Sequence, residues 1–201
     1  MKINIGEQLL ALVITVIGVF IALALDNFVA QKNERTRFQK LINISFIECQ
    51  SHINQLNSFV VGIQQNIEPF VTNPPGSFFE KNMPSFLLSI DNVLNNENLV
   101  EYASPNSISI LLQNIKHARI YQNYLTDWKS LGTIENVKIG LKSIVGYYSM
   151  VSYSLFTISN GIEDTYSVEK YNRLVEHMSN RSNHNSLLKK LNRDEIKKII
   201  G

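Results

Sequence analysis

The feature that most constrains this chain is a run of seventeen consecutive uncharged residues, Leu9 to Leu25. Twelve of the seventeen are Leu, Ile, Val or Phe. Each of these favours membrane insertion by roughly 0.3–0.6 kcal/mol near the bilayer centre, so their sum is several kcal/mol. A helix of this length spans about 25 Å, which is slightly short for the ~30 Å hydrocarbon core of a bilayer. The sequence therefore predicts a transmembrane helix near the N-terminus.

Three other kinds of segment can contain such an apolar run. A buried helix in a soluble core is disfavoured, because core helices are rarely apolar on every face. A cleaved signal peptide would explain Lys2 and the small-x-small pattern of Ala22-Leu23-Ala24, but the helical pattern continues past Asp26 without Gly or Pro. An interfacial amphipathic helix would need a long charged face, which this run lacks.

The flanks of the span predict its orientation. Lysine or arginine occupies positions 32, 35, 37 and 40 after the span, whereas Lys2 is the one such residue before it. The positive-inside rule then places the N-terminus outside and the rest of the chain in the cytoplasm. The single cysteine, Cys49, fits a reducing compartment. A net charge of +2 argues against a protein that coats nucleic acid.

The rest of the chain is helical in pattern, and the predicted fold class is all-α. From Phe38 to Ile67 apolar residues recur at spacings of three and four, with Gly62 as an isolated glycine. We therefore expect a transmembrane helix with short flanks over 1–28, a juxtamembrane stalk helix over 29–68 and a cytosolic helical domain over 69–201. The stalk is expected to end at Glu68-Pro69.

Breakers and capping residues divide the helical domain into further helices. Residues 73–76 and 179–186 read as loops. The expected helices run from Pro84 to about Asn95, from Pro105 to Gly132, from Thr133 to Asn160-Gly161, from Ser167 to Met178, and from Leu187 to Ile200, the last being basic and amphipathic.

Catalytic chemistry is not indicated. The chain has no glycine-rich phosphate loop, no HExxH and no serine-elbow motif. Its four histidines, at 52, 117, 177 and 184, are too widely spaced for a recognisable metal site, and there is no cysteine cluster. We expect no catalytic residue, no metal and no cofactor; an enzyme with an unfamiliar site stays as an alternative.

A stripe of small and polar residues runs along the predicted span. At 100° per residue its members fall within an arc of about 100°. Small residues let membrane helices approach closely, so the stripe predicts self-association. In a ring of helices the same stripe would line a pore with an acidic ring at each mouth and a hydroxyl ring midway, which suits cations. The stripe consists of Glu7, Ala11, Thr15, Gly18, Ala22 and Asp26.

Basic and aromatic residues gather on two predicted helices of the domain. Arginine and tyrosine together can hold phosphates and stack on bases, so the cluster is a candidate ligand site. The alternative is that the rings are core and the cations are a solvated face. The candidate ligand residues are Lys116, Arg119, Tyr121, Tyr124, Lys138 and Lys142, with His117, Trp128, Lys129, Tyr147 and Tyr148 beside them.

The N-terminal segment resembles a group of bacterial single-pass proteins. These carry Gly-Glu, an apolar run ending G-x-x-I-A-L, an acidic or amide pair, and usually Trp. Here Gly6-Glu7 and the segment Gly18 to Asn27 match, and Phe28 stands in the Trp position. The layout is also similar to small phage-defence membrane effectors, such as the channel subunit of the Hailong system and the membrane effectors of type III CRISPR systems.

That resemblance implies a homo-oligomer, a tetramer by analogy, whose cytosolic domain binds a nucleotide or oligonucleotide made by a partner nucleotidyltransferase. No ligand-binding residue carries over from it. The resulting expectation is an oligomeric membrane effector that forms a pore or ion channel in antiviral defence. The alternative is a non-conducting membrane anchor or scaffold that recruits a cytosolic protein.

Overall fold

The computed structural model describes residues 5–68, 76–126, 133–163, 165–180 and 193–200. Every regular element in these ranges is a helix, so the predicted all-α fold class is confirmed. The chain divides into two compact units, residues 1–37 and residues 38–201. The helix α1, Ile5–Gln64, belongs to both.

The first unit consists of the N-terminal part of α1. Every side chain described here, from Ile14 to Arg37, is exposed. The exposed side chains include large apolar ones, such as Phe20, which is 68% exposed, and Phe28, which is 65% exposed. Exposed apolar surfaces of this size are typical of sites that contact a membrane or another protein.

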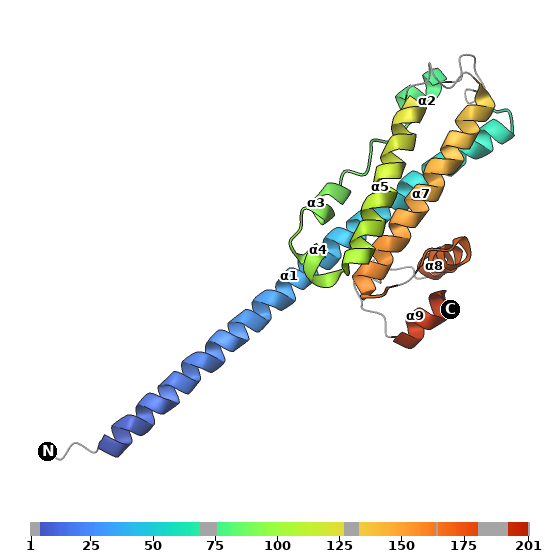
Figure 1. The fold of residues 1–201 in the computed structure, drawn as a ribbon. Coiled ribbons are helices and arrows are strands. Elements are labelled where there is room, and N and C mark those ends of the chain that lie inside the picture. Colours follow the sequence, from blue (N-terminus) through green and yellow to red (C-terminus); the bar gives the residue numbers. More distant parts are fainter. Residues whose placement is uncertain (1–4, 69–75, 127–132, 164, 181–192, 201) are drawn as a thin grey trace. The chain divides into compact units, whose positions relative to one another are not determined.

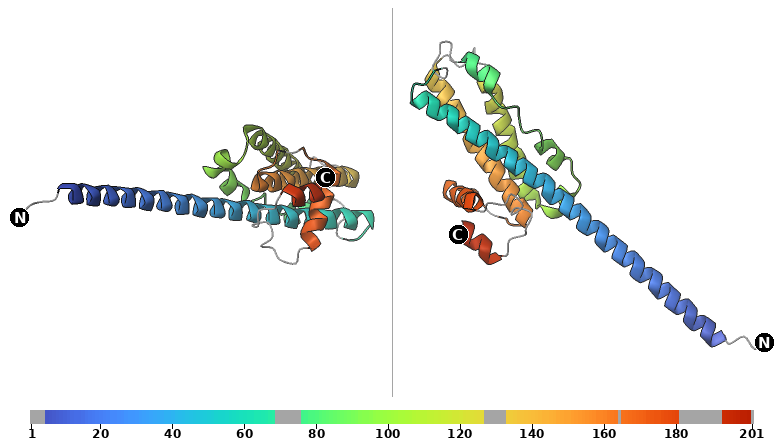
Figure 2. Two further views of the ribbon diagram at one scale, coloured as in Figure 1. Left: turned by 90° about the horizontal axis from the view of Figure 1, so that it is seen from below. Right: turned by 180° about the vertical axis from the view of Figure 1, so that it is seen from behind.

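The second unit is a helical bundle around α7, Ile134–Asn160. Figures 1 and 2 show α5, Pro105–Thr126, beside α7, with the residue 38–64 part of α1 packed along the same bundle. All side chains from Val151 to Phe156 are buried, so this half of α7 is covered on every face. At Gly140 an added Cβ would lie 2.6 Å from Leu125 Cδ2, so α5 and α7 lie close together there and a larger residue would require the Leu125 side chain to move.

The segment expected as a stalk supplies one wall of this core. Phe38, Ile42, Ser45 and Cys49 are each at most 2% exposed, at the predicted spacings of three and four. The helix ends at Gln64, four residues before the expected Glu68, because Asn66 adopts a left-handed φ of 52° that a helix cannot continue through.

Several predicted boundaries are confirmed by capping contacts. The Thr133 hydroxyl accepts a hydrogen bond from the amide of Asn136 at 3.3 Å, and Gly161 ends α7 with a φ of 65°. The Ser167 hydroxyl accepts from the amide of Lys170 at 3.1 Å and begins α8, Val168–Asn180. The last helix, α9, runs Arg193–Ile200, and the expected start at Leu187 lies outside the described residues.

The prediction of a helix from Pro84 to Asn95 was wrong for its first half. The helix there is α3, Ile90–Leu94, and residues 84–87 are not helical. Two short helices were not predicted, α2 at Gly76–Asn82 and α4 at Asn98–Tyr102. The segment before α3 does not form a helix because its backbone groups hydrogen-bond to side chains of other helices, as described below.

Candidate functional site

The apolar N-terminal part of α1 is the first candidate feature. Among the described helices, α1 is the one long and apolar enough to cross a membrane, and none of its most apolar window is buried. Thr15, Gly18, Ala22 and Asp26 all lie on this exposed surface. At Gly18 an added Cβ would meet no atom within 4 Å, so the surface at the middle of the stripe is open. Glu7 and Ala11 lie in α1, but their side chains are outside the described part.

The predicted basic and aromatic cluster separates into three places. Arg119 lies at 3.6 Å from the Asp91 carboxylate, and its guanidinium lies 4.6 Å from the centre of the Phe86 ring. These contacts hold the Arg119 side chain over the segment between α2 and α4. An ion pair this exposed is worth at most about 1 kcal/mol, so Asp91 does not prevent Arg119 from binding another anion.

The aromatic members of the cluster form a stack between α5 and α7. The rings of Tyr121 and Tyr147 lie 5.4 Å apart at 27°, and the His117 ring lies 5.1 Å from Tyr147. All three are partly buried, and Tyr124 on the same face of α5 is 40% exposed. The stack therefore presents a half-buried aromatic surface.

The lysines are not gathered around this stack. Lys138 lies 3.5 Å from the Glu135 carboxylate, and Lys116 and Lys142 are exposed. By helical geometry Lys138 and Lys142 lie about 140–180° around α7 from Tyr147. Trp128 and Lys129 lie outside the described residues. The structure thus brings together Tyr121, Tyr147 and His117, and it does not bring the predicted cations together.

A polar network that the sequence did not predict clamps the segment before α3. The Glu48 carboxylate accepts hydrogen bonds from the amides of Leu88 at 2.8 Å and Ser89 at 2.9 Å, and from the Ser89 hydroxyl. Partial burial raises the pKa of Glu48, but the hydrogen bonds from Ser89 and Leu88 outweigh it and hold that pKa below its ordinary value. Glu48 thus fixes the start of α3 to α1.

The other side of this segment is held by α5 and α7. The Gln122 amide donates to the Pro84 carbonyl at 2.6 Å, and the Tyr148 hydroxyl donates to Gln122 Oε1. The Phe86 ring packs 6.2 Å from the Tyr148 ring. Burial raises the pKa of Tyr148, so this hydroxyl stays protonated and remains a donor. Through Glu48, Gln122 and Tyr148, the segment before α3 is thus joined to α1, α5 and α7.

Beside this network the interface between α1 and α7 contains polar side chains. The Cys49 thiol is fully buried, which raises its pKa to about 12 and makes it unreactive. His52 lies 5.7 Å from Tyr148 and is 9% exposed, and its burial lowers its pKa. The buried Ser45 hydroxyl and His52 Nδ1 have no hydrogen-bond partner. Among the described residues no three His, Cys, Asp or Glu side chains could hold a metal.

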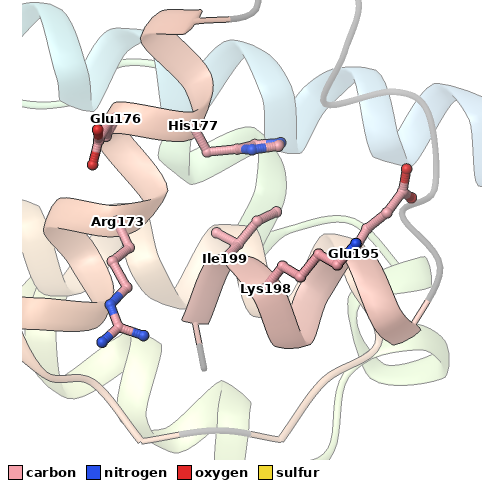
Figure 3. Close-up of a pocket in the computed structure, with 6 residues that line it drawn as sticks. All are labelled: Arg173, Glu176, His177, Glu195, Lys198 and Ile199. Atoms are coloured by element: carbon pink, nitrogen blue, oxygen red, sulfur yellow. The ribbon is translucent and has the colours of Figure 1, made fainter.

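A surface pocket of about 330 Å³ lies between α8 and α9. Figure 3 shows His177 and Ile199 at its centre, with charged side chains of both signs around them. Arg173 is already bonded to Glu169 at 2.6 Å. The mixed charges give this pocket no preference for one kind of ion. Its lining residues are Arg173, Glu176, His177, Glu195, Lys198 and Ile199.

Comparison with known proteins identifies no relative: no family model, no curated protein and no solved structure matches the chain.

Proposed function

We propose that this protein is a single-pass effector of the bacterial inner membrane, which assembles from several copies and forms a pore or ion channel in antiviral defence. The observation that carries the proposal is α1 itself. It is a 60-residue helix that is apolar and exposed over its first part and supplies a wall of the domain core from Phe38 to Ile63. No loop separates the two parts, so a change in the helical domain can reach the span through helical backbone alone.

The span supports self-association through its stripe of small residues. Gly18 and Ala22 allow close approach of neighbouring helices in lipid, where packing rather than hydrophobicity drives association. In a ring of copies Glu7 and Asp26 would face the pathway at opposite mouths and favour cations, and Thr15 would face it midway. By analogy with the phage-defence effectors, the proposed assembly is a tetramer.

The proposed ligand is a nucleotide or oligonucleotide, supplied by a partner nucleotidyltransferase. The support is the half-buried stack of Tyr121, Tyr147 and His117, on which a base could lie. Its phosphates would need cations, and Lys116 and Lys142 lie about 140° around α5 and α7 from Tyr121 and Tyr147, so the phosphates would have to extend away from the stack to reach them. Binding should weaken as salt rises, because counterions are released.

The proposed topology places the N-terminus outside and the helical domain in the cytoplasm, on the basis of the lysines and arginines after the span. A reporter that is active only in the periplasm, fused after Gly201, should be silent. Periplasmic activity there would mean that the N-terminus is cytoplasmic and that the helical domain and its ligand lie in the periplasm.

A non-conducting anchor that recruits a cytosolic protein is the second candidate function. It is favoured by exposed apolar side chains on the helical domain, including Leu88 at 73%, Val100 at 77% and Val168 at 64%.

Single-channel recording of the purified full-length protein in planar bilayers separates the two functions. A pore carries current, and changing both Glu7 and Asp26 to Lys should shift its reversal potential toward anions. Thr15→Leu should reduce the current by dewetting without preventing insertion. An assembled protein that carries no current under any ligand condition would leave the anchor as the function.

A further inference from the structure

The two sets of contacts that hold the segment 84–89 meet at one histidine. His52 lies on α1 four residues after Glu48, and side chains at this spacing are neighbours on one side of a helix. Its ring also lies 5.7 Å from the ring of Tyr148, which holds the other end of the segment through Gln122. His52 therefore adjoins both the carboxylate that binds this segment from α1 and the hydroxyl that supports it from α7.

The surroundings of His52 suit only the neutral form of its ring. The side chain is 9% exposed, and its Nδ1 atom has no hydrogen-bond partner among the described residues. Protonation would make both ring nitrogens donors and would add a buried charge, which is costly without a partner. Burial accordingly lowers the pKa of His52. The ring is therefore neutral near pH 7 and gains a need for an acceptor when it is protonated.

Glu48 is the one charged group that acts on this ring among the described residues. Cys49 of α1 and Tyr148 of α7 lie beside it, but burial raises the pKa of each, so both stay neutral. Burial likewise keeps Tyr171 of α8 neutral by raising its pKa. The segment before α3 has no titratable residue, and Arg119 of α5 is paired with a carboxylate of α3. A protonated ring therefore has the Glu48 carboxylate as its charged partner.

We infer that His52 is an acid-sensitive latch: when its ring is protonated, it draws the Glu48 carboxylate away from Leu88 and Ser89 and releases the segment 84–89 from α1. The two oxygens of Glu48 already accept from the Leu88 amide, the Ser89 amide and the Ser89 hydroxyl. A further charged donor thus competes with these three. The inference goes beyond the proposed function and does not depend on it, because the latch lies wholly within the helical domain.

The sign of the pH dependence follows from the two environments of the ring. In the released state the Glu48 carboxylate becomes the partner of His52, so the pKa of His52 rises toward its ordinary value of about 6.5. The released state then takes up a proton more readily than the closed state. Its population rises as pH falls below about 6.5, by at most about tenfold per pH unit. Glu48 stays ionised until the pH approaches about 4.3, so the latch works between about pH 5 and pH 6.5.

The contact at the other end of the segment carries no charge. There the Gln122 amide donates to the Pro84 carbonyl, and the neutral Tyr148 hydroxyl supports Gln122. Protonation of His52 adds no competing acceptor at this end. Release therefore begins at Leu88 and Ser89, and the amides of these two residues report on it directly.

Hydrogen exchange of the full-length protein in detergent, read at the Leu88 and Ser89 amides, tests the inference. Rates are corrected for intrinsic exchange at each pH. We expect the protection of these two amides to fall by at least about fivefold between pH 7.5 and pH 5. We also expect residues 151–156, in the covered half of α7, to be much better protected throughout, because release is local. Constant protection at Leu88 and Ser89 would overturn the latch. Equal protection in both places would also overturn it, because the whole domain would then be unfolding.

Substitution of the histidine removes the proposed switch. His52→Gln keeps a polar side chain that cannot be protonated, so the protection at Leu88 and Ser89 should change by less than about twofold over the same pH range. The matched control is His117→Gln, a change on α5 in the ring stack with Tyr147, which should keep the pH dependence of the parent. A His52→Gln variant that follows the parent, or a His117→Gln variant that loses the pH dependence, would overturn the inference.

Glu48→Gln tests the same step with the histidine intact. The neutral amide holds Leu88 and Ser89 less strongly and gives a protonated ring no charge to draw. Protection at these amides should therefore be low already at pH 7.5 and should fall no further at pH 5. A Glu48→Gln variant that loses protection between these pH values by the same factor as the parent would show that Glu48 is not the group that His52 draws, and would overturn the latch.

Discussion

Within α1, phenylalanines have opposite environments in the two units of the chain. Phe20 and Phe28 are 68% and 65% exposed, whereas Phe38 and Phe46 are 2% and 3% exposed. In residues 14–29 the apolar side chains surround the helix, but in residues 38–63 they occupy one side and polar residues occupy much of the other. A helix that is apolar all round suits lipid, and a helix that is apolar on one side suits the edge of a bundle. The pattern of apolar residues, and not their number, tells the two environments apart.

The largest effect is expected where the first pattern is broken. Changing both Ile17 and Phe20 to Arg adds two charges near the middle of the span, at a total cost of roughly 5–7 kcal/mol. The protein should then be lost from carbonate-washed membranes. The control changes exposed Asn54 and Asn57 of the second unit to Arg, which should leave the protein in the membrane. Retention of the double span variant would refute a transmembrane role for this segment.

Truncation of a buried leucine tests the second pattern. Leu56 is 0% exposed, so Leu56→Ala should destabilise the helical domain by about 2–5 kcal/mol. Leu23 is 55% exposed, and Leu23→Ala should change the same free energy of unfolding by less than about 0.5 kcal/mol. Urea unfolding in detergent, followed by circular dichroism, measures both. Equal effects would mean that the two parts of α1 do not differ as described.

A hydroxyl deletion tests whether polar contacts also hold the bundle. Tyr148→Phe removes the donor to Gln122 Oε1, which then lies buried without that bond, and should cost about 1–3 kcal/mol. Tyr124→Phe is the matched control, since its side chain is 40% exposed. The same urea titration measures the difference. A Tyr148→Phe variant as stable as the parent would show that this bond contributes little.

The smallest effect concerns the clamp at Glu48 and depends on pH. Because hydrogen bonds lower the pKa of Glu48 in the folded protein, its stabilisation is complete above the unfolded pKa of about 4.3 and is lost as pH falls through the folded value. Glu48→Gln should cost about 1 kcal/mol at pH 7. The difference from the parent should shrink toward zero as pH falls below about 4. A difference that stays constant with pH would argue against the ionised carboxylate, and exposed Glu101→Gln serves as the control.

The parts of the structure that could be predicted from sequence are those with local causes. The apolar run, the three-and-four spacing from Phe38, the Thr133 and Ser167 caps and the Gly161 end all depend on residues within a few positions of each other. The segment 84–89 depends instead on Glu48 and Gln122, which lie on helices far away along the chain in either direction, and no local pattern announces such contacts. Proline at position 84 is as compatible with an extended segment as with the start of a helix.

The candidate site illustrates the same limit. Residue type predicted an aromatic and basic cluster on two neighbouring helices, and the structure joins Tyr121 to Tyr147. Lys138 and Lys142 lie on another side of α7 from Tyr147, and this could have been predicted by counting 100° per residue along the helix.

Cysteine labelling in membranes tests the two environments of α1 most directly. Phe20→Cys and Asn57→Cys, each in a Cys49→Ser background, are treated with a water-soluble maleimide in inverted inner-membrane vesicles and again after addition of SDS. We predict that Asn57→Cys reacts in both conditions and that Phe20→Cys reacts only in SDS, because lipid shields its thiol. Equal labelling of both cysteines in intact vesicles would contradict the membrane span, and with it the proposed function.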